Sequence, residues 1–196
     1  MVIEKLSSVI ESRDENTGEH VLRTKNYVGI LAREMQKDDA FRDQLSDELI
    51  EEIENAAPLH DIGKIAIPDA ILLKPGRLTP DEFEMIKGHT VKGGAMIGTL
   101  FSELEDTLFL RLAEEITVYH HERWDGTGYP KGLKGKDIPL AARIMAVADV
   151  YDALVSDRVY KKAVSREEAL SIIYGEAGTH FDPDIIRILH RIEGQI

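Results

Sequence analysis

The stretch His120-His121-Glu122-Arg123-Trp124-Asp125-Gly126-Thr127-Gly128-Tyr129-Pro130 is the most informative part of this chain. Two adjacent histidines lead into an acidic, glycine-rich turn that closes with Gly128-Tyr129-Pro130. Imidazoles bind divalent metals well, and a loop punctuated by glycine and proline can fold over a bound ligand. The stretch therefore predicts a metal site that is covered by a loop.

Helical periodicity dominates the sequence around this stretch. Val21, Val28, Leu31 and Met35 recur at steps of three to seven residues, the spacing of one apolar helix face. No alternating run is long enough for a sheet, so an all-α fold is expected. Capping residues and prolines predict further helices: from Ser46 through Ala57, from Thr79-Pro80 past His89, from about Leu104 to His121, from near Leu140 across Asp149 and Asp152, from Ser165, and from Asp182-Pro183. Residues 68–78 and 125–139 are expected to be loops.

Composition restricts the class of protein. The 196 residues fit one compact domain, and a hydrophobic content of 43% is enough for a core. The chain has no cysteine, which excludes disulfides and thiolate metal sites, and no apolar run approaches the roughly 20 residues of a membrane span. With no signal peptide in the sequence, we expect a cytoplasmic location.

The formal net charge of −12 argues against binding to long nucleic acids, which requires a basic surface. A small phosphate ligand is compatible with this charge. Two divalent cations would add about four positive charges at one site, and the charge of the ions dominates such a site.

A second motif, His60-Asp61-Ile62-Gly63-Lys64, supplies the other residue types that a binuclear metal site needs. Such a site requires several neutral imidazoles and a carboxylate that can bridge two ions. Five of the seven histidines lie in motif-like settings: His20, His60, His89, His120 and His121. Together the two motifs resemble the HD-GYP family, the metal-dependent cyclic-di-GMP phosphodiesterases of bacteria, and the resemblance extends from about Arg13 to Pro183.

The resemblance implies an HD-superfamily helical bundle with additional helices and a long Gly/Pro-rich loop. Residues 1–196 would form one catalytic domain, with residues 1–12 as a linker helix to a sensor domain that such proteins often carry. Asp61 would bridge two divalent ions, iron or manganese, and a metal-bridging hydroxide would be the nucleophile. The remaining ligands would divide into two sets: His20, His60 and Asp149 for one ion, and His89, His120 and His121 for the other.

The resemblance also implies residues that bind the substrate. Lys64 would neutralise phosphate charge or assist the leaving oxygen, so we expect it to act in catalysis as well as in binding. Arg158 and Lys161, three residues apart, would share a helix face and grip one phosphate. Asp152 would either orient a metal ligand or contact the substrate. The loop residues Gly128, Tyr129 and Pro130 would contact diguanylate cyclase domains.

Three further residues of metal-binding or aromatic type lie outside the ligand pattern. Trp124 is expected to be a core anchor rather than a platform for a nucleobase. His180 is interpreted as a loop residue and His190 as a residue of a helix surface, and neither is expected to have a function.

Asn16 departs from the family pattern. Some members carry a glutamate at this position, four residues before the first histidine, and it supports a third metal. Asparagine is a poorer ligand for a divalent ion, so we expect two metals and the linear dinucleotide pGpG as the main product. Hydrolysis on to GMP would accompany a third metal.

Two alternatives to a cyclic-di-GMP phosphodiesterase remain open. One is a hydrolase that acts on another cyclic dinucleotide. The other is a catalytically degenerate module that only binds cyclic-di-GMP or serves as a scaffold. Association into a homodimer is also left open by the sequence.

Overall fold

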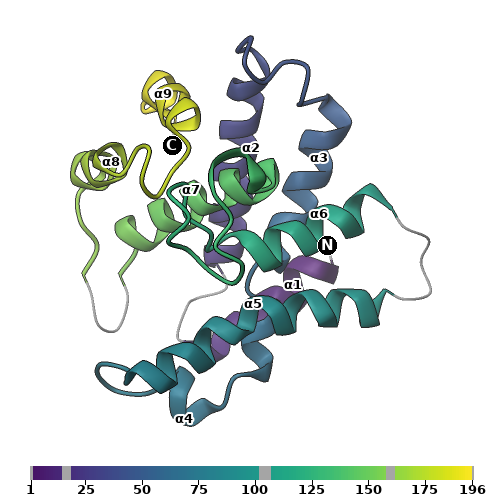
Figure 1. Ribbon diagram of the computed structural model, residues 1–196, viewed down its shortest axis with the longest axis vertical. Helices are drawn as coiled ribbons and strands as arrows, with labels where there is room; N and C mark the ends of the chain where they lie inside the picture. The colour runs from purple at the N-terminus through teal and green to yellow at the C-terminus, as the bar shows by residue number, and fades with distance from the viewer. Residues whose placement is uncertain (1, 15–18, 102–106, 158–161, 196) are drawn as a thin grey trace.

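The computed structural model describes residues 2–14, 19–101, 107–157 and 162–195 (Figure 1). Within these ranges all regular elements are helical, and the only extended pairing is an isolated bridge between Ala177 and Phe181. The all-α prediction is therefore confirmed. None of the described helices is both long enough and apolar enough to cross a membrane.

The longer helices account for most of the described chain. They are α1 (Val2–Glu11), α2 (Glu19–Gln36), α3 (Asp47–Ala56), α5 (Pro80–Leu100), α6 (Leu108–Tyr119), α7 (Leu140–Val155), α8 (Arg166–Gly175) and α9 (Pro183–Ile192). Shorter elements connect them: η1 (Ser12–Asp14), η2 (Ala57–Leu59), η3 (Ile62–Ala66), α4 (Asp69–Leu72) and η4 (Gly135–Asp137).

Side-chain caps explain where several helices start. The hydroxyl of Thr79 accepts a hydrogen bond from the backbone N–H of Glu82, whose carboxylate accepts one from the N–H of Thr79. This reciprocal pair is a capping box, and Pro80 occupies the first turn, where its missing N–H is harmless. The hydroxyls of Ser46 and Ser165 cap α3 and α8 by accepting one backbone hydrogen bond each, without the return bond of a capping box. These predicted starts are confirmed.

The structure differs from the prediction at the start of α6 and in the expected loop at residues 68–78. Helix α6 begins at Leu108, where the hydroxyl of Thr107 caps it, whereas a start near Leu104 was expected; residues 102–106 lie outside the described ranges. The expected loop at residues 68–78 contains the single helical turn α4 after Pro68, whose backbone is extended and which gives the turn no side-chain cap.

Helix α7 forms the centre of the hydrophobic core. It is buried on most of its circumference because small and branched apolar residues such as Ala141, Ile144, Met145 and Ala148 follow one another, and its buried Arg143 and Asp152 are held in ion pairs. Helices α2, α6 and α8 pack directly against it, and α9 packs on α2. In Figure 1, α8 and α9 lie on the side of the molecule opposite α4 and α5.

A close backbone contact joins η3 to α5. A β-carbon placed on Gly63 would lie 1.9 Å from the carbonyl oxygen of His89 and 2.6 Å from the backbone nitrogen of Gly93. Only glycine permits this approach. Helix α6 also packs on α5, and the two helices lie side by side (Figure 1). The contact holds the chain after Asp61 directly against the part of α5 that carries His89.

We predict that Gly63→Ala lowers the free energy of unfolding by about 1–3 kcal/mol, because the methyl group must push two backbones apart. Gly98→Ala is the matched control on α5. A β-carbon at Gly98 would have no neighbouring atom within 4 Å, so this substitution should stabilise the protein by up to about 1 kcal/mol through helix propensity. Urea unfolding of both variants measures the difference. Equal effects of the two substitutions would contradict the close contact.

Candidate metal centre

The seven predicted metal ligands come together in one buried cluster. They lie on α2, the segment between η2 and η3, α5, the residues after α6, and α7, so the site is assembled from most of the fold. His20, His60, His89 and His120 are each at most 2% exposed, and Asp61 is 7% exposed. Groups that titrate in water are rarely buried in such number without a charged partner.

Hydrogen bonds fix which ring nitrogen of each buried histidine carries the proton. Nδ1 of His60 lies 3.0 Å from the carbonyl oxygen of Ala57, and Nδ1 of His89 lies 2.7 Å from that of Ile86. Nδ1 of His120 lies 2.9 Å from the carbonyl oxygen of Ile116. A carbonyl oxygen only accepts, so each Nδ1 must donate, and in the neutral ring Nε2 is left with a lone pair. That tautomer is the one a metal ligand needs.

The two oxygens of Asp61 face different histidines. Oδ1 lies 3.2 Å from Nε2 of His89 and 3.8 Å from Nε2 of His120. Oδ2 lies 3.3 Å from Nε2 of His60 and 2.9 Å from Nζ of Lys64. Among the buried side-chain atoms of the described residues, Oδ1 of Asp61 and Nε2 of His89 and of His120 have no hydrogen-bond partner. A carboxylate between two imidazole sets has the arrangement of a bridging ligand.

The prediction that α6 extends through His121 is wrong. The helix ends at Tyr119 and His120 is its C-cap, followed by a turn in which the N–H of Glu122 donates to the carbonyl oxygen of Tyr119. Because the backbone leaves the helical path there, both rings face the cluster, with centroids 4.0 Å apart. His121 and His120 both have a ring nitrogen within 4.8 Å of donor atoms of Asp61 and His89.

His20 belongs to the other half of the cluster. Its Nε2 lies 3.4 Å from Nε2 of His60 and 3.6 Å from Oδ1 of Asp149. Its Nδ1 lies 2.6 Å from Oδ2 of Asp152, which is buried and also accepts hydrogen bonds from the guanidinium of Arg23. Asp152 therefore sits behind His20, as a group that orients a metal ligand would. Arg23 was not singled out from the sequence, because an arginine one turn after a histidine is common on a helix surface.

Glu11, at the end of α1, is a further member that the sequence analysis missed. Its side chain is 1% exposed, and its Oε1 lies 3.9 Å from Nε2 of His20 and 4.0 Å from Nε2 of His60. Neither carboxylate oxygen has a hydrogen-bond partner among the described residues. Burial raises the pKa of this carboxyl group, against the attraction of both histidines.

The carboxylates perturb the histidines around them. Burial alone would lower the pKa of His60, but the negative charges of Asp61, Asp149 and Glu11 raise it to about 9. For His121 burial outweighs the negative charges of Asp149 and Asp61 and lowers its pKa to about 4. Lys64 and the protonated His60 offset two of the three carboxylates of Glu11, Asp61 and Asp149, which leaves an excess of one negative charge at the metal-free centre. A buried excess of negative charge favours a cation.

The loop after α6 is organised by a second buried carboxylate. Glu122 is 2% exposed and accepts hydrogen bonds from the backbone N–H groups of Lys131 and Leu133, at 2.7 and 3.0 Å. The Tyr129–Pro130 peptide is cis, and the ring of Tyr129 stacks on His121 with centroids 4.8 Å apart. The loop thereby covers one edge of the cluster. Its acidic residue could not be told from other loop acids by sequence.

A pocket of about 310 Å³ opens beside His121 and Tyr129. Its other walls come from α5, the loop and the segment before α9: Phe83, Lys87, Arg123, Thr127, Gly128 and His180. Phe83 is 47% exposed, and the ammonium of Lys87 lies 5.0 Å from its ring and 5.5 Å from that of Tyr129. His180 is in a loop as predicted, but it lines this pocket. Single aromatic and basic residues on a helix carry no sequence signal of their own, which is why the exposed Phe83 and the partly buried Lys87 were missed.

Several residues of the sequence analysis lie elsewhere. Trp124 is half-buried, with the guanidinium of Arg143 6.0 Å from its ring. His190 is exposed on α9, as predicted, and stacks on Tyr174. Asn16, Arg158 and Lys161 lie outside the described residues.

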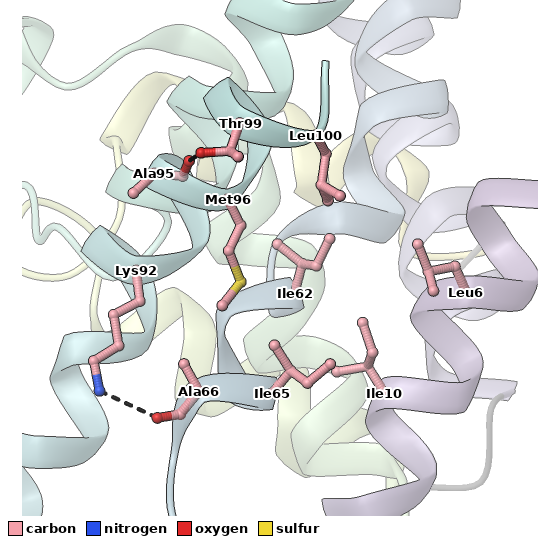
Figure 2. Close-up of a pocket in the computed structure, with 10 residues that line it drawn as sticks. All are labelled: Leu6, Ile10, Ile62, Ile65, Ala66, Lys92, Ala95, Met96, Thr99 and Leu100. Atoms are coloured by element: carbon pink, nitrogen blue, oxygen red, sulfur yellow. Dashed lines mark hydrogen bonds between the residues drawn. The ribbon is translucent and has the colours of Figure 1, made fainter. Parts of the chain in front are cut away.

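A cavity of about 700 Å³ lies between α1, η3 and α5 and is shown in Figure 2. Its lining is apolar apart from Thr99 and Lys92, whose ammonium donates to the carbonyl oxygen of Ala66. None of the predicted site residues lines it. The cavity is therefore not the place where a charged nucleotide would meet the cluster.

Comparison with known proteins shows the family to which this chain belongs. A protein of Vibrio cholerae named "Probable cyclic di-GMP phosphodiesterase" is 52% identical over 191 residues, covering 94% of this chain and 42% of that protein. A "3'3'-cGAMP-specific phosphodiesterase 2" of the same organism is 37% identical, covering 96% of this chain and 34% of that protein. The chain thus spans less than half the length of these relatives.

A solved structure of a V. cholerae phosphodiesterase specific for cyclic GMP-AMP has the same fold, with a TM-score of 0.63 at 18% identity. The match covers 99% of this chain and 48% of that one. The family model described as "HD domain" matches residues 4–185. The chain therefore belongs to the HD domain family, and its motifs place it in the HD-GYP branch.

Proposed function

We propose that this chain is the catalytic part of a metal-dependent phosphodiesterase that hydrolyses cyclic-di-GMP. The observation that carries the proposal is the convergence of the Nε2 lone pairs of His60, His89 and His120 on the two oxygens of Asp61. The relative at 52% identity is named a probable cyclic di-GMP phosphodiesterase, and this name supports the choice of substrate.

The donor set fits two divalent ions. Donor atoms bound to one ion at about 2.1 Å would lie roughly 3.0–4.2 Å apart, from cis to trans positions. The distances from Asp61 to His60, His89 and His120 are 3.2–3.8 Å, inside that range. Imidazole with carboxylate suits iron or manganese, and two ions are proposed rather than three because Asn16 replaces a carboxylate. When bound, such ions lower the pKa of water towards neutrality and supply a hydroxide nucleophile.

The protein's own residues would position the substrate at this centre. Lys64, 2.9 Å from Asp61, is placed to neutralise a phosphate oxygen close to the metal ligands. The pocket beside His121 offers the rings of Tyr129 and Phe83 to a guanine, with Lys87 and Arg123 at its sides. Arg158 and Lys161 are proposed for the second phosphate, as the family pattern implies. With two ions, the expected product is pGpG.

Two other functions remain as alternatives with specific grounds. A relative at 37% identity is named as specific for 3'3'-cGAMP, so a cyclic dinucleotide with one adenine is the second candidate substrate. A degenerate binding module is disfavoured because every predicted metal ligand is retained. Contact of Gly128, Tyr129 and Pro130 with a diguanylate cyclase domain stays a prediction.

The first test measures turnover. Protein purified without oxygen and loaded with Mn²⁺ or Fe²⁺ should convert cyclic-di-GMP to pGpG and contain about two metals per chain. The Asp61→Asn variant should lose most of this activity and most of the bound metal. Asp81→Asn, exposed in the first turn of α5, is the matched control and should retain activity. Chromatography of the products and metal counting by mass spectrometry give the result. Faster cleavage of 3'3'-cGAMP would favour the second substrate, and full activity of Asp61→Asn would refute the site.

The second test uses pH. A metal binds neutral imidazole, and His60 in the metal-free protein has a pKa of about 9, so below that pH a proton must leave before the ion binds. The apparent affinity for Mn²⁺ should therefore rise about tenfold per pH unit between about pH 6 and 8, with about one proton released per ion. Calorimetry in buffers of different ionisation enthalpy measures both quantities. An affinity that is independent of pH would contradict the role of His60.

The third test concerns the guanine pocket. Phe83→Ala should raise KM for cyclic-di-GMP by roughly five- to hundredfold, because stacking of a base on an aromatic ring is worth about 1–3 kcal/mol. The metal content should not change. Met85→Ala is the control, since Met85 is 45% exposed on the same helix and does not line the pocket. If the two variants have the same KM, the base does not bind there.

A further inference from the structure

The feature that the proposed mechanism leaves unexplained is the buried carboxylate of Glu11. Both of its oxygens are inaccessible to solvent and have no hydrogen-bond partner among the described residues. An isolated buried carboxylate destabilises a protein unless a cation or a donor compensates it. Its ion-pair contacts among the described residues are with His20 and His60, at 3.9 and 4.0 Å, and both are expected metal ligands.

The distances place Glu11 within reach of the same ion as these histidines. Its Oε1 lies 3.9 Å from Nε2 of His20 and 4.0 Å from Nε2 of His60, and those two nitrogens are 3.4 Å apart. All three separations lie in the range of roughly 3.0–4.2 Å between donor atoms that share one ion. Together with Asp61, these three residues have donor atoms within 4.8 Å of one another. The His20 half of the centre therefore has room for one more carboxylate ligand.

The position of Glu11 is fixed by the packing of its helix. Helix α1 contacts α2, η2 and η3, the elements that carry or flank His20, His60 and Asp61. Figure 2 shows Ile10, the residue before Glu11, against Ile65 of η3. Ile10 is 5% exposed and belongs to the hydrophobic core. An apolar anchor next to Glu11 keeps its carboxylate directed into the cluster.

We propose that Glu11 is a direct ligand of the ion held by His20, His60, Asp61 and Asp149, so that α1 forms part of the metal centre. This inference rests on the proposed metal centre and adds a ligand that the family motifs do not include. It would bring the carboxylates around that ion to three, from α1, the η2–η3 segment and α7.

The test compares Glu11→Gln with the wild-type chain in the metal-free and Mn²⁺-loaded states. Glutamine has the same shape without the charge, so the metal-free variant should melt at a higher temperature than the metal-free wild type. The gain in melting temperature on adding Mn²⁺ should shrink, and the affinity of one of the two ions should fall at least about tenfold. Glu4→Gln is the matched control, two turns earlier on the same helix and paired with Lys25.

Opposite shifts of the metal-free and loaded melting temperatures, with one ion weakened, support ligation by Glu11. Unchanged affinities and an unchanged Mn²⁺-induced shift in Glu11→Gln would overturn the inference and leave the metal centre intact. If the wild-type chain itself binds no Mn²⁺, the proposed metal centre fails together with the inference. The wild-type measurement therefore distinguishes failure of the centre from failure of the Glu11 assignment alone. The same loss of affinity in Glu4→Gln would assign the effect to the helix and not to the carboxylate, which also overturns the inference.

Discussion

Five imidazoles surround one buried carboxylate in this protein, and the rest of the structure is arranged to make that possible. Asp61 faces His60 with one oxygen and His89 and His120 with the other. Each of these groups would be unfavourable in a dry interior by itself. Gly63 allows the backbone after Asp61 to approach α5, and the end of α6 turns both of its histidines inward. The packing of the helices thus serves the cluster.

The hydrogen bonds that hold the histidines are part of the helices themselves. The carbonyl groups of Ala57, Ile86 and Ile116 lie three or four residues before the histidines that they bind. The carbonyl oxygens of Ala57 and Ile116 also accept the backbone N–H of the same histidine, and the second lone pair of a carbonyl oxygen is available for the ring N–H. The ring bond sets the tautomer of the ligand. Fold and chemistry therefore depend on one set of interactions.

Much of this arrangement could be predicted from the sequence, because periodicity and caps are local signals. Thr79-Pro80 and Ser165 marked helix starts, and the resemblance to the HD-GYP family implied the ligand set. The backbone turn that lets both His120 and His121 face the cluster could not be predicted, since it depends on the helix ending at Tyr119. Glu11 was missed because its role depends on where α1 packs. A glutamate at the end of an amphipathic helix resembles any solvated acid until the tertiary structure is known.

The excess of buried negative charge has a consequence for the lifetime of the chain in a cell. Without ions, Glu11, Asp61 and Asp149 repel one another in the interior, so the free energy of folding is smaller and the unfolded fraction is larger. Cellular proteases degrade unfolded chains, and a change of only about 1–2 kcal/mol alters abundance severalfold. The amount of this protein would then follow the supply of metal as well as the rate of its synthesis.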